Sequence, residues 1–261
     1  MPFIAHRIFG WEPIVIDETW GLNTIRQGNA YSVCRTLQCA GCELVFLDIR
    51  FRDDEMARLY NDYRGEVYTE LRERYEPDYR IRNEQLDDGS EYVEMVEAFL
   101  EPYLHGSIRL LDWGGDTGKN TPFKSEAAGF DIYDISNKPV ISGARRVDHE
   151  EAVQGNYSLI VCANVLEHVA YPLECLDQIR NLMNNETVLY VEVPFEALMK
   201  ERDSARYLRK KHWHEHINFF SESSLRKLMK TAGFEIVGIH TLDVTVAEKR
   251  SSVFQVACKK T

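Results

Sequence analysis

The sequence predicts an α/β protein with a doubly wound, mostly parallel sheet of seven strands, the last one antiparallel, preceded by a small N-terminal α+β subdomain. From residue 91 onward, short apolar runs alternate with segments of helical periodicity, as in chains that build a parallel sheet. The last two apolar runs are joined by a short segment without a clear helix, which favours an antiparallel hairpin at the sheet edge. Residues 1–90 lack this alternation. We therefore expect a subdomain over 1–90 and the main domain over 91–261.

The subdomain is expected to hold two short strands, over 31–33 and 43–47, followed by a charged helix over about 53–74. That helix places Met56, Leu59, Tyr60 and Tyr63 on one face, so we expect it to pack on the core. The run 87–90, Asp-Asp-Gly-Ser, is typical of a loop and marks the boundary with the main domain.

The main domain begins with a helix that ends near Pro102. Apolar runs then predict strands over 108–112, 130–133, 144–147, 159–163, 188–193, 234–240 and 252–258. Helical patterns fit between several of them, over 117–128, 172–183 and 223–232, the last one stopped by Gly233.

Composition limits the class of protein. With 261 residues the chain can form one core domain and an appendage, and its 44% hydrophobic content is ordinary for a globular protein. No apolar run approaches the roughly 18 residues needed to span a membrane, and the first residues lack a signal-peptide pattern, so we expect a cytoplasmic protein. The net charge of −11 argues against binding nucleic acid or anionic membranes. Six scattered cysteines indicate reduced thiols rather than a disulfide framework.

A glycine-rich turn follows the first strand of the main domain. Its spacing is Asp112-x-Gly114-x-Asp116-x-Gly118, and we expect a helix after it whose free N–H groups face a ligand. A dinucleotide site needs Gly-x-Gly-x-x-Gly so that a pyrophosphate can approach. Carboxylates at Asp112 and Asp116 would repel a pyrophosphate and attract a ligand that carries an ammonium and a sulfonium. The turn therefore favours S-adenosylmethionine.

Two further acids follow the next strands. Asp134 lies 22 positions after Asp112, close to the spacing at which a carboxylate meets ribose hydroxyls, although it could also only cap a turn. Asp148 follows the third strand and could accept a hydrogen bond from an adenine amino group. It could equally be a solvated loop acid.

These motifs, together with residues 157–169 and Val191-Glu192-Val193-Pro194, resemble the class I S-adenosylmethionine-dependent methyltransferases over about residues 91–261. The resemblance implies a Rossmann-like methyltransferase fold. It also implies that Asn164 to His168 lie beneath the methionine end of the cofactor. The cofactor-binding residues predicted in this way are Asp112, Trp113, Gly114, Asp116, Gly118, Asp134, Ile135, Asp148, Asn164, Glu167 and His168. Asp116 departs from the family pattern, which more often has glycine there.

A second cluster of titratable groups spans residues 211–220. Four titratable side chains within five positions are more than a routine surface turn carries: His212, His214, Glu215 and His216. The spacing lacks the His-Glu-x-x-His pattern of a helical metal site, so we predict no metal here. A histidine held by a carboxylate can take a proton from the methyl acceptor, and His216 is the first candidate, with Glu215 and His214 beside it. The alternative is a histidine-rich loop that closes the site without proton transfer.

The segment 213–221 is similar to the His-Glu-His loop of methyltransferases that act on sugar nucleotides and related natural-product intermediates, in which the pair at Glu215 and His216 serves deprotonation. Cys39 and Cys42, with Cys34 and His6, resemble the end of the zinc module of those enzymes. Only one Cys-x-x-Cys pair is present, and we predict a metal-free remnant.

The predicted function is methyl transfer from S-adenosylmethionine to a small-molecule acceptor, a sugar or glycan precursor that is free or linked to a nucleotide or a lipid. O-methylation and C-methylation both stay open, as does the oligomeric state. Two alternatives remain at this point: a nicotinamide-dependent oxidoreductase of Rossmann type, which shares the fold logic, and a catalytically silent nucleoside-binding module.

Overall fold

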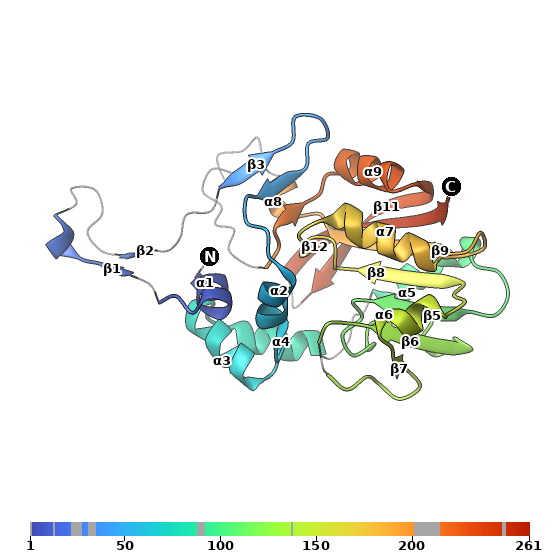
Figure 1. Ribbon diagram of the computed structural model, residues 1–261, viewed down its shortest axis with the longest axis horizontal. Helices are drawn as coiled ribbons and strands as arrows, with labels where there is room; N and C mark the ends of the chain where they lie inside the picture. The colour runs from blue at the N-terminus through green and yellow to red at the C-terminus, as the bar shows by residue number, and fades with distance from the viewer. Residues whose placement is uncertain are drawn as a thin grey trace.

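A computed structural model of the protein describes residues 2–12, 14–21, 28–30, 35–87, 92–136, 138–200, 215–246 and 249–261. A seven-stranded sheet occupies one end of the molecule, the antiparallel pair of β1 and β2 projects at the opposite end, and helices α1 to α4 lie between them (Figure 1). No helix among the described residues is long and apolar enough to cross a membrane.

The sheet has the strand order β11-β12-β9-β8-β5-β6-β7. Strands β5 to β9 are parallel wherever they pair, whereas β12 is antiparallel to β9 and to β11. The predicted fold class, with its antiparallel edge hairpin, is confirmed. The strands are β5 (Arg109–Trp113), β6 (Gly129–Tyr133), β7 (Arg145–Arg146), β8 (Leu159–Ala163), β9 (Val188–Pro194), β11 (Phe234–Val246) and β12 (Lys249–Lys260).

Alternate residues of each strand point to opposite sides of this sheet, and helices cover both sides, so both faces are buried. Leu111, Ile160 and Val191 belong to a core shared with α6 (His149–Val153), α7 (Pro172–Leu182) and α9 (Glu222–Thr231). Their neighbours Leu110, Leu159 and Tyr190 belong to another core, which includes α5 (Val93–Leu100) and is bordered by the 3-10 turn η2 (Glu101–Tyr103). Helices on both faces fix the sheet rigidly, so that its strand ends can position a site.

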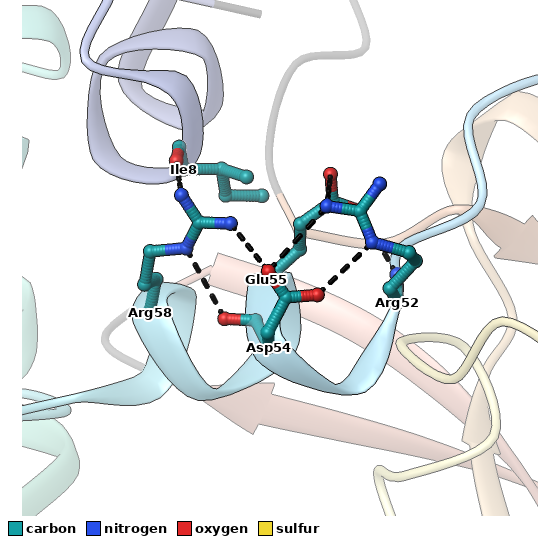
Figure 2. A network of polar contacts seen from close by, with 5 residues as sticks. All are labelled: Ile8, Arg52, Asp54, Glu55 and Arg58. Carbon is teal, nitrogen blue, oxygen red and sulfur yellow. Dashed lines mark hydrogen bonds and ion pairs between the residues drawn. The ribbon is translucent and has the colours of Figure 1, made fainter.

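The N-terminal region packs around its own core. Its helices are α1 (Pro2–Phe9), α2 (Asp53–Tyr60), α3 (Glu66–Tyr75) and α4 (Tyr79–Asp87), and its other elements are β1 (Ile14–Ile16), η1 (Glu18–Trp20), β2 (Gly28–Ala30), β3 (Thr36–Gln38) and β4 (Val45–Leu47). Glu55 accepts a hydrogen bond from the backbone N–H of Arg52 at the start of α2. Arg58 ties α2 to α1 by donating to Asp54 and to the carbonyl of Ile8 at 3.1 Å (Figure 2).

Residues from the second half of the chain complete this core. Leu198 and Met199 of α8 (Ala197–Lys200) pack in it, and β10 (Asn218–Phe219) pairs antiparallel with β4. The boundary at residue 90 stays a prediction, but the segments on either side of the histidine-rich loop pack with the N-terminal helices.

Several predicted elements differ from the structure. Residues 117–128 form successive turns instead of a helix: Gly118 and Phe123 have φ values of +80° and +57°, and Pro122 lacks the N–H that a helix interior uses. The prediction that a helix begins here and turns its N–H groups toward the ligand is therefore wrong.

The predicted helix over 53–74 is broken into α2 and α3, because Asp62 and Arg64 take positive φ values of +54° and +56°. The strand expected over 144–147 is reduced to β7, and the one over 31–33 lies outside the described residues.

Candidate active site

The candidate site lies where the parallel strands β5, β6, β8 and β9 end. In open α/β sheets, ligands bind outside the carboxyl ends of the strands. Asp112 lies near the end of β5, Asp134 directly follows β6, Asn164 directly follows β8, and Glu196 lies two residues beyond β9. The sheet topology therefore brings together residues that are far apart in sequence.

The glycine-rich turn is tightly packed. Gly114 has a φ of +83°, and a Cβ added there would lie 2.4 Å from Cγ2 of Val165. Gly118 has a φ of +80°, and its Cβ would lie 2.4 Å from Cδ1 of Ile132. Only glycine fits both the backbone conformation and the space at these two positions.

Asp112 is a buried carboxyl group, 5% exposed, and it accepts a hydrogen bond from the hydroxyl of Thr121. Burial raises the pKa of Asp112 to about 7, the Thr121 hydrogen bond opposes this, and the nearby Asp134 and Asp116 add to it. No ion pair to Asp112 occurs among the described residues. A cationic ligand at this edge would stabilise its ionised form.

Asp134 organises the turn. Its carboxylate accepts hydrogen bonds from the backbone N–H groups of Asp116 at 2.8 Å and Ser136 at 2.6 Å. Carboxylate oxygens accept more than one hydrogen bond, so ribose hydroxyls can still be bound. Asp116 itself pairs with Lys138 at 3.1 Å. Its charge is therefore balanced within the protein, and Asp112 is the carboxylate of this turn that is left for a cation.

The remaining residues predicted at the cofactor take different positions. Trp113 is buried, and the centroid of its ring lies 4.3 Å from that of Tyr133, whereas Ile135 is 58% exposed. Asp148 is the N-cap of α6 and accepts a hydrogen bond from the backbone of Glu151 at 2.8 Å. Its predicted contact with adenine is thus in competition with a structural role.

Asn164 is held in a left-handed conformation, with a φ of +55°. Its side-chain amide donates to Glu192 at 2.9 Å, and Glu192 is 1% exposed. Tyr92 and Tyr190 also donate to Glu192, at 2.8 and 2.6 Å. Sequence reasoning missed Glu192 as a site residue, although a carboxylate within an otherwise apolar strand is a usable signal.

Four side chains meet at the far end of the site. Nδ1 of His216 lies 2.5 Å from Oε1 of Glu196, and the ring of His216 meets that of His168 edge-on with centroids 4.6 Å apart. Nε2 of His168 lies 3.6 Å from Oε1 of Glu167. Burial, assisted by the neighbouring His216, lowers the pKa of His168 well below its ordinary value, so this imidazole is neutral. Burial also raises the pKa of Glu167 well above its ordinary value.

Glu215 does not hold His216, contrary to the predicted pairing. Its carboxylate accepts hydrogen bonds from Tyr68 and Arg72, both buried on α3. The carboxylate beside His216 is Glu196, which sequence reasoning missed even though an acid just after a parallel strand is a recognisable signal. His212 and His214 lie outside the described residues. Of the cysteines compared with a zinc module, Cys39 and Cys42 lie between β3 and β4, and Cys34 is not described.

Comparisons with known proteins bear on the family and the fold of the chain. Residues 82–239 match the family described as "Methyltransferase domain". The structure is similar to Burkholderia thailandensis 1,6-didemethyltoxoflavin-N1-methyltransferase with bound 1,6-didemethyltoxoflavin and S-adenosylhomocysteine. The TM-score is 0.55 and the identity 16%, over 84% of this chain and 95% of that one. This similarity shows the shared fold.

Two further structures were compared. For an S-adenosylmethionine-dependent methyltransferase from Anabaena variabilis the TM-score is 0.49 and the identity 16%, over 66% of this chain and 84% of that one. For magnesium protoporphyrin IX methyltransferase from Synechocystis the TM-score is 0.44 and the identity 18%, over 77% of this chain and 92% of that one. No curated protein sequence gives a significant match.

Proposed function

The chain belongs to the methyltransferase-domain family and is an S-adenosylmethionine-dependent methyltransferase, and we propose that its methyl acceptor is a sugar or glycan precursor. The observation that carries the donor assignment is Asp112, a buried carboxyl group without an ion pair among the described residues, at the strand ends where this fold binds its ligand. A ligand with an ammonium and a sulfonium supplies the missing positive charge. Family membership decides against the oxidoreductase alternative.

The cofactor is proposed to lie along the strand ends from Asp134 to Asn164. Asp134 would hold the ribose hydroxyls while keeping its bonds to the backbone of the turn. Gly114 and Gly118 let the turn pack closely there, and the segment from Asn164 to His168 would line the methionine end. Asp148 would reach the adenine only with the carboxylate oxygen that does not cap α6.

The acceptor is proposed to lose its proton at His216. Glu196 orients the ring through its contact with Nδ1, and the imidazole so held takes a proton from the acceptor. The electron pair released on the acceptor then attacks the methyl carbon, the carbon–sulfur bond breaks, and S-adenosylhomocysteine leaves. Methyl transfer is an in-line displacement, so positioning supplies much of the remaining acceleration.

A small-molecule acceptor is supported by the similar Burkholderia structure, whose own ligand is 1,6-didemethyltoxoflavin. The sugar class is supported by the similarity of residues 213–221 to the loop of sugar-nucleotide methyltransferases. The same similarity includes both hydroxyl and carbon acceptors. An ionisable proton on the acceptor is the feature that both have in common.

Calorimetric titration with S-adenosylhomocysteine tests the donor site. We expect one site per chain, weakened by Asp134→Ala, and a folded protein that binds neither this product nor S-adenosylmethionine would refute the proposal. Incubation of the protein and S-adenosylmethionine with a panel of nucleotide sugars tests the acceptor. A sugar that gains one methyl group by mass spectrometry supports the class, and methylation confined to non-sugar acceptors contradicts it.

A further inference from the structure

Glu167 is a buried carboxyl group that lacks hydrogen-bond partners among the described residues. It is 1% exposed, and neither of its carboxylate oxygens has a hydrogen-bond partner among the described residues. Nδ1 of the adjacent His168 is also buried without such a partner. Buried polar groups are nearly always hydrogen-bonded, so a buried carboxyl group with no partner for either oxygen points to a missing ligand. The methyl-transfer proposal places Glu167 in the segment that lines the methionine end, but it gives the two carboxylate oxygens no partner.

The ligand atoms of Glu167, His168 and His216 converge. One carboxylate oxygen and two imidazole nitrogens lie within 4.8 Å of one another. The backbone holds them together, because the carbonyl of Glu167 accepts hydrogen bonds from the N–H groups of Ile217 at 2.8 Å and Asn218 at 3.1 Å. Backbone hydrogen bonds therefore join the segment that carries Glu167 and His168 to the segment that carries His216.

The carboxylate beside the cluster has the geometry of an outer support for a metal ligand. Histidines that bind metal almost always donate their other ring N–H to a carboxylate or carbonyl, which orients the ring and raises its basicity. Oε1 of Glu196 lies 2.5 Å from Nδ1 of His216, which is the arrangement of such an outer support. Two imidazoles and one carboxylate form the donor set that suits Zn²⁺ and related transition metals.

From these contacts we infer that Glu167, His168 and His216 bind a divalent transition-metal cation, with Glu196 as the outer carboxylate that orients His216. This inference departs from the sequence-based expectation of no metal at His216, because two of the three ligands come from a distant segment. Three protein ligands leave an open coordination position, as in catalytic rather than structural zinc sites. The charges of Glu167 and Glu196 balance the cation within a largely buried environment.

This inference rests on the proposed function and revises one step of it. With the cation bound, His216 is a ligand and no longer takes the proton. The acceptor oxygen instead occupies the open position, which lowers its pKa, and its proton passes to water. The resulting oxyanion attacks the methyl carbon as the carbon–sulfur bond breaks.

Calorimetric titration of Zn²⁺ into the chelator-treated protein tests the site. Cys39→Ser and Cys42→Ser are both introduced first, because thiolates bind the same ion. We expect one equivalent of Zn²⁺ to bind. Glu167→Gln should abolish this binding, and Glu196→Gln should weaken it about 10- to 100-fold. His240→Asn, at an exposed position away from the cluster, is the matched control and should bind as the parent does.

If Glu167→Gln does not fold by circular dichroism, His216→Asn, whose side chain is 21% exposed, replaces it in the titration. Absent Zn²⁺ binding, or binding that these variants leave unchanged, overturns the inference. Titration with S-adenosylhomocysteine in the same samples keeps the two proposals apart: a protein that binds the product but no Zn²⁺ refutes only the cation site. Binding of Zn²⁺ without the product refutes only the methyl-transfer assignment.

Discussion

Replacement of Asp112 by asparagine should make the protein more stable at alkaline pH. The pKa of this carboxyl group is 3.8 in an unfolded chain and about 7 in the folded protein. A raised folded-state pKa means that the folded protein holds the proton more tightly, so stability falls as pH rises from near 4 to near 7. At about 1.4 kcal/mol per unit, the loss expected between pH 5 and pH 9 is about 3 kcal/mol. The asparagine side chain cannot ionise, and its carbonyl oxygen still accepts the Thr121 hydrogen bond.

Urea unfolding of the two proteins at intervals from pH 5 to pH 9 measures this directly. The difference between their unfolding free energies isolates Asp112, because the other titrating groups are common to both. We expect the difference to grow in favour of Asp112→Asn up to about pH 8 and then to level off. If the two plots of unfolding free energy against pH run parallel across this range, the assignment of Asp112 as a buried carboxyl group with a raised pKa is refuted. A change of S-adenosylhomocysteine affinity alone would not rescue it.

Three other substitutions test separate parts of the structure. Arg72→Met leaves the buried carboxylate of Glu215 without its guanidinium, so the unfolding free energy should drop by about 3–5 kcal/mol in chemical denaturation, and an unchanged midpoint would contradict the buried pair. Gly118→Ala forces a Cβ to within 2.4 Å of Ile132 at a φ of +80°, which should cost about 1–3 kcal/mol and weaken calorimetric binding of S-adenosylhomocysteine. His216→Ala should lower kcat by about 10²–10⁴-fold while cofactor binding is retained, and unchanged turnover would leave positioning as the mechanism.

The sheet was predictable because its signals are local. The apolar runs at 159–163 and 188–193 match β8 and β9 within one residue, and each run is buried on both faces. The turn at Gly114 was predictable for the same reason, since a positive φ with no room for a Cβ selects glycine. Residues 117–128 misled the prediction, because their composition suits a helix while Gly118, Pro122 and Phe123 together impose turns.

Pairings between distant segments were not predictable. Glu215 precedes His216 in sequence, and adjacency suggested that the two act together. In the structure the neighbouring side chains diverge: Glu215 binds Arg72 of α3, whereas His216 meets Glu196 and His168. Only the fold brings positions 72, 168 and 196 to the same loop. An acid just after a parallel strand marks Glu196 as a candidate, but no local signal pairs it with His216.

This divergence gives the two halves of the Glu215–His216 pair different tasks. The buried bonds of Glu215 to Tyr68 and Arg72 fix the loop to the N-terminal helices, and β10 extends that attachment by pairing with β4. The next residue, His216, is thereby held against the strand ends of the seven-stranded sheet. The N-terminal region then contributes to this end of the site by positioning His216. Arg72→Met separates these roles: with the fold retained, it should impair turnover through His216 while binding of S-adenosylhomocysteine at Asp112 and Asp134 persists.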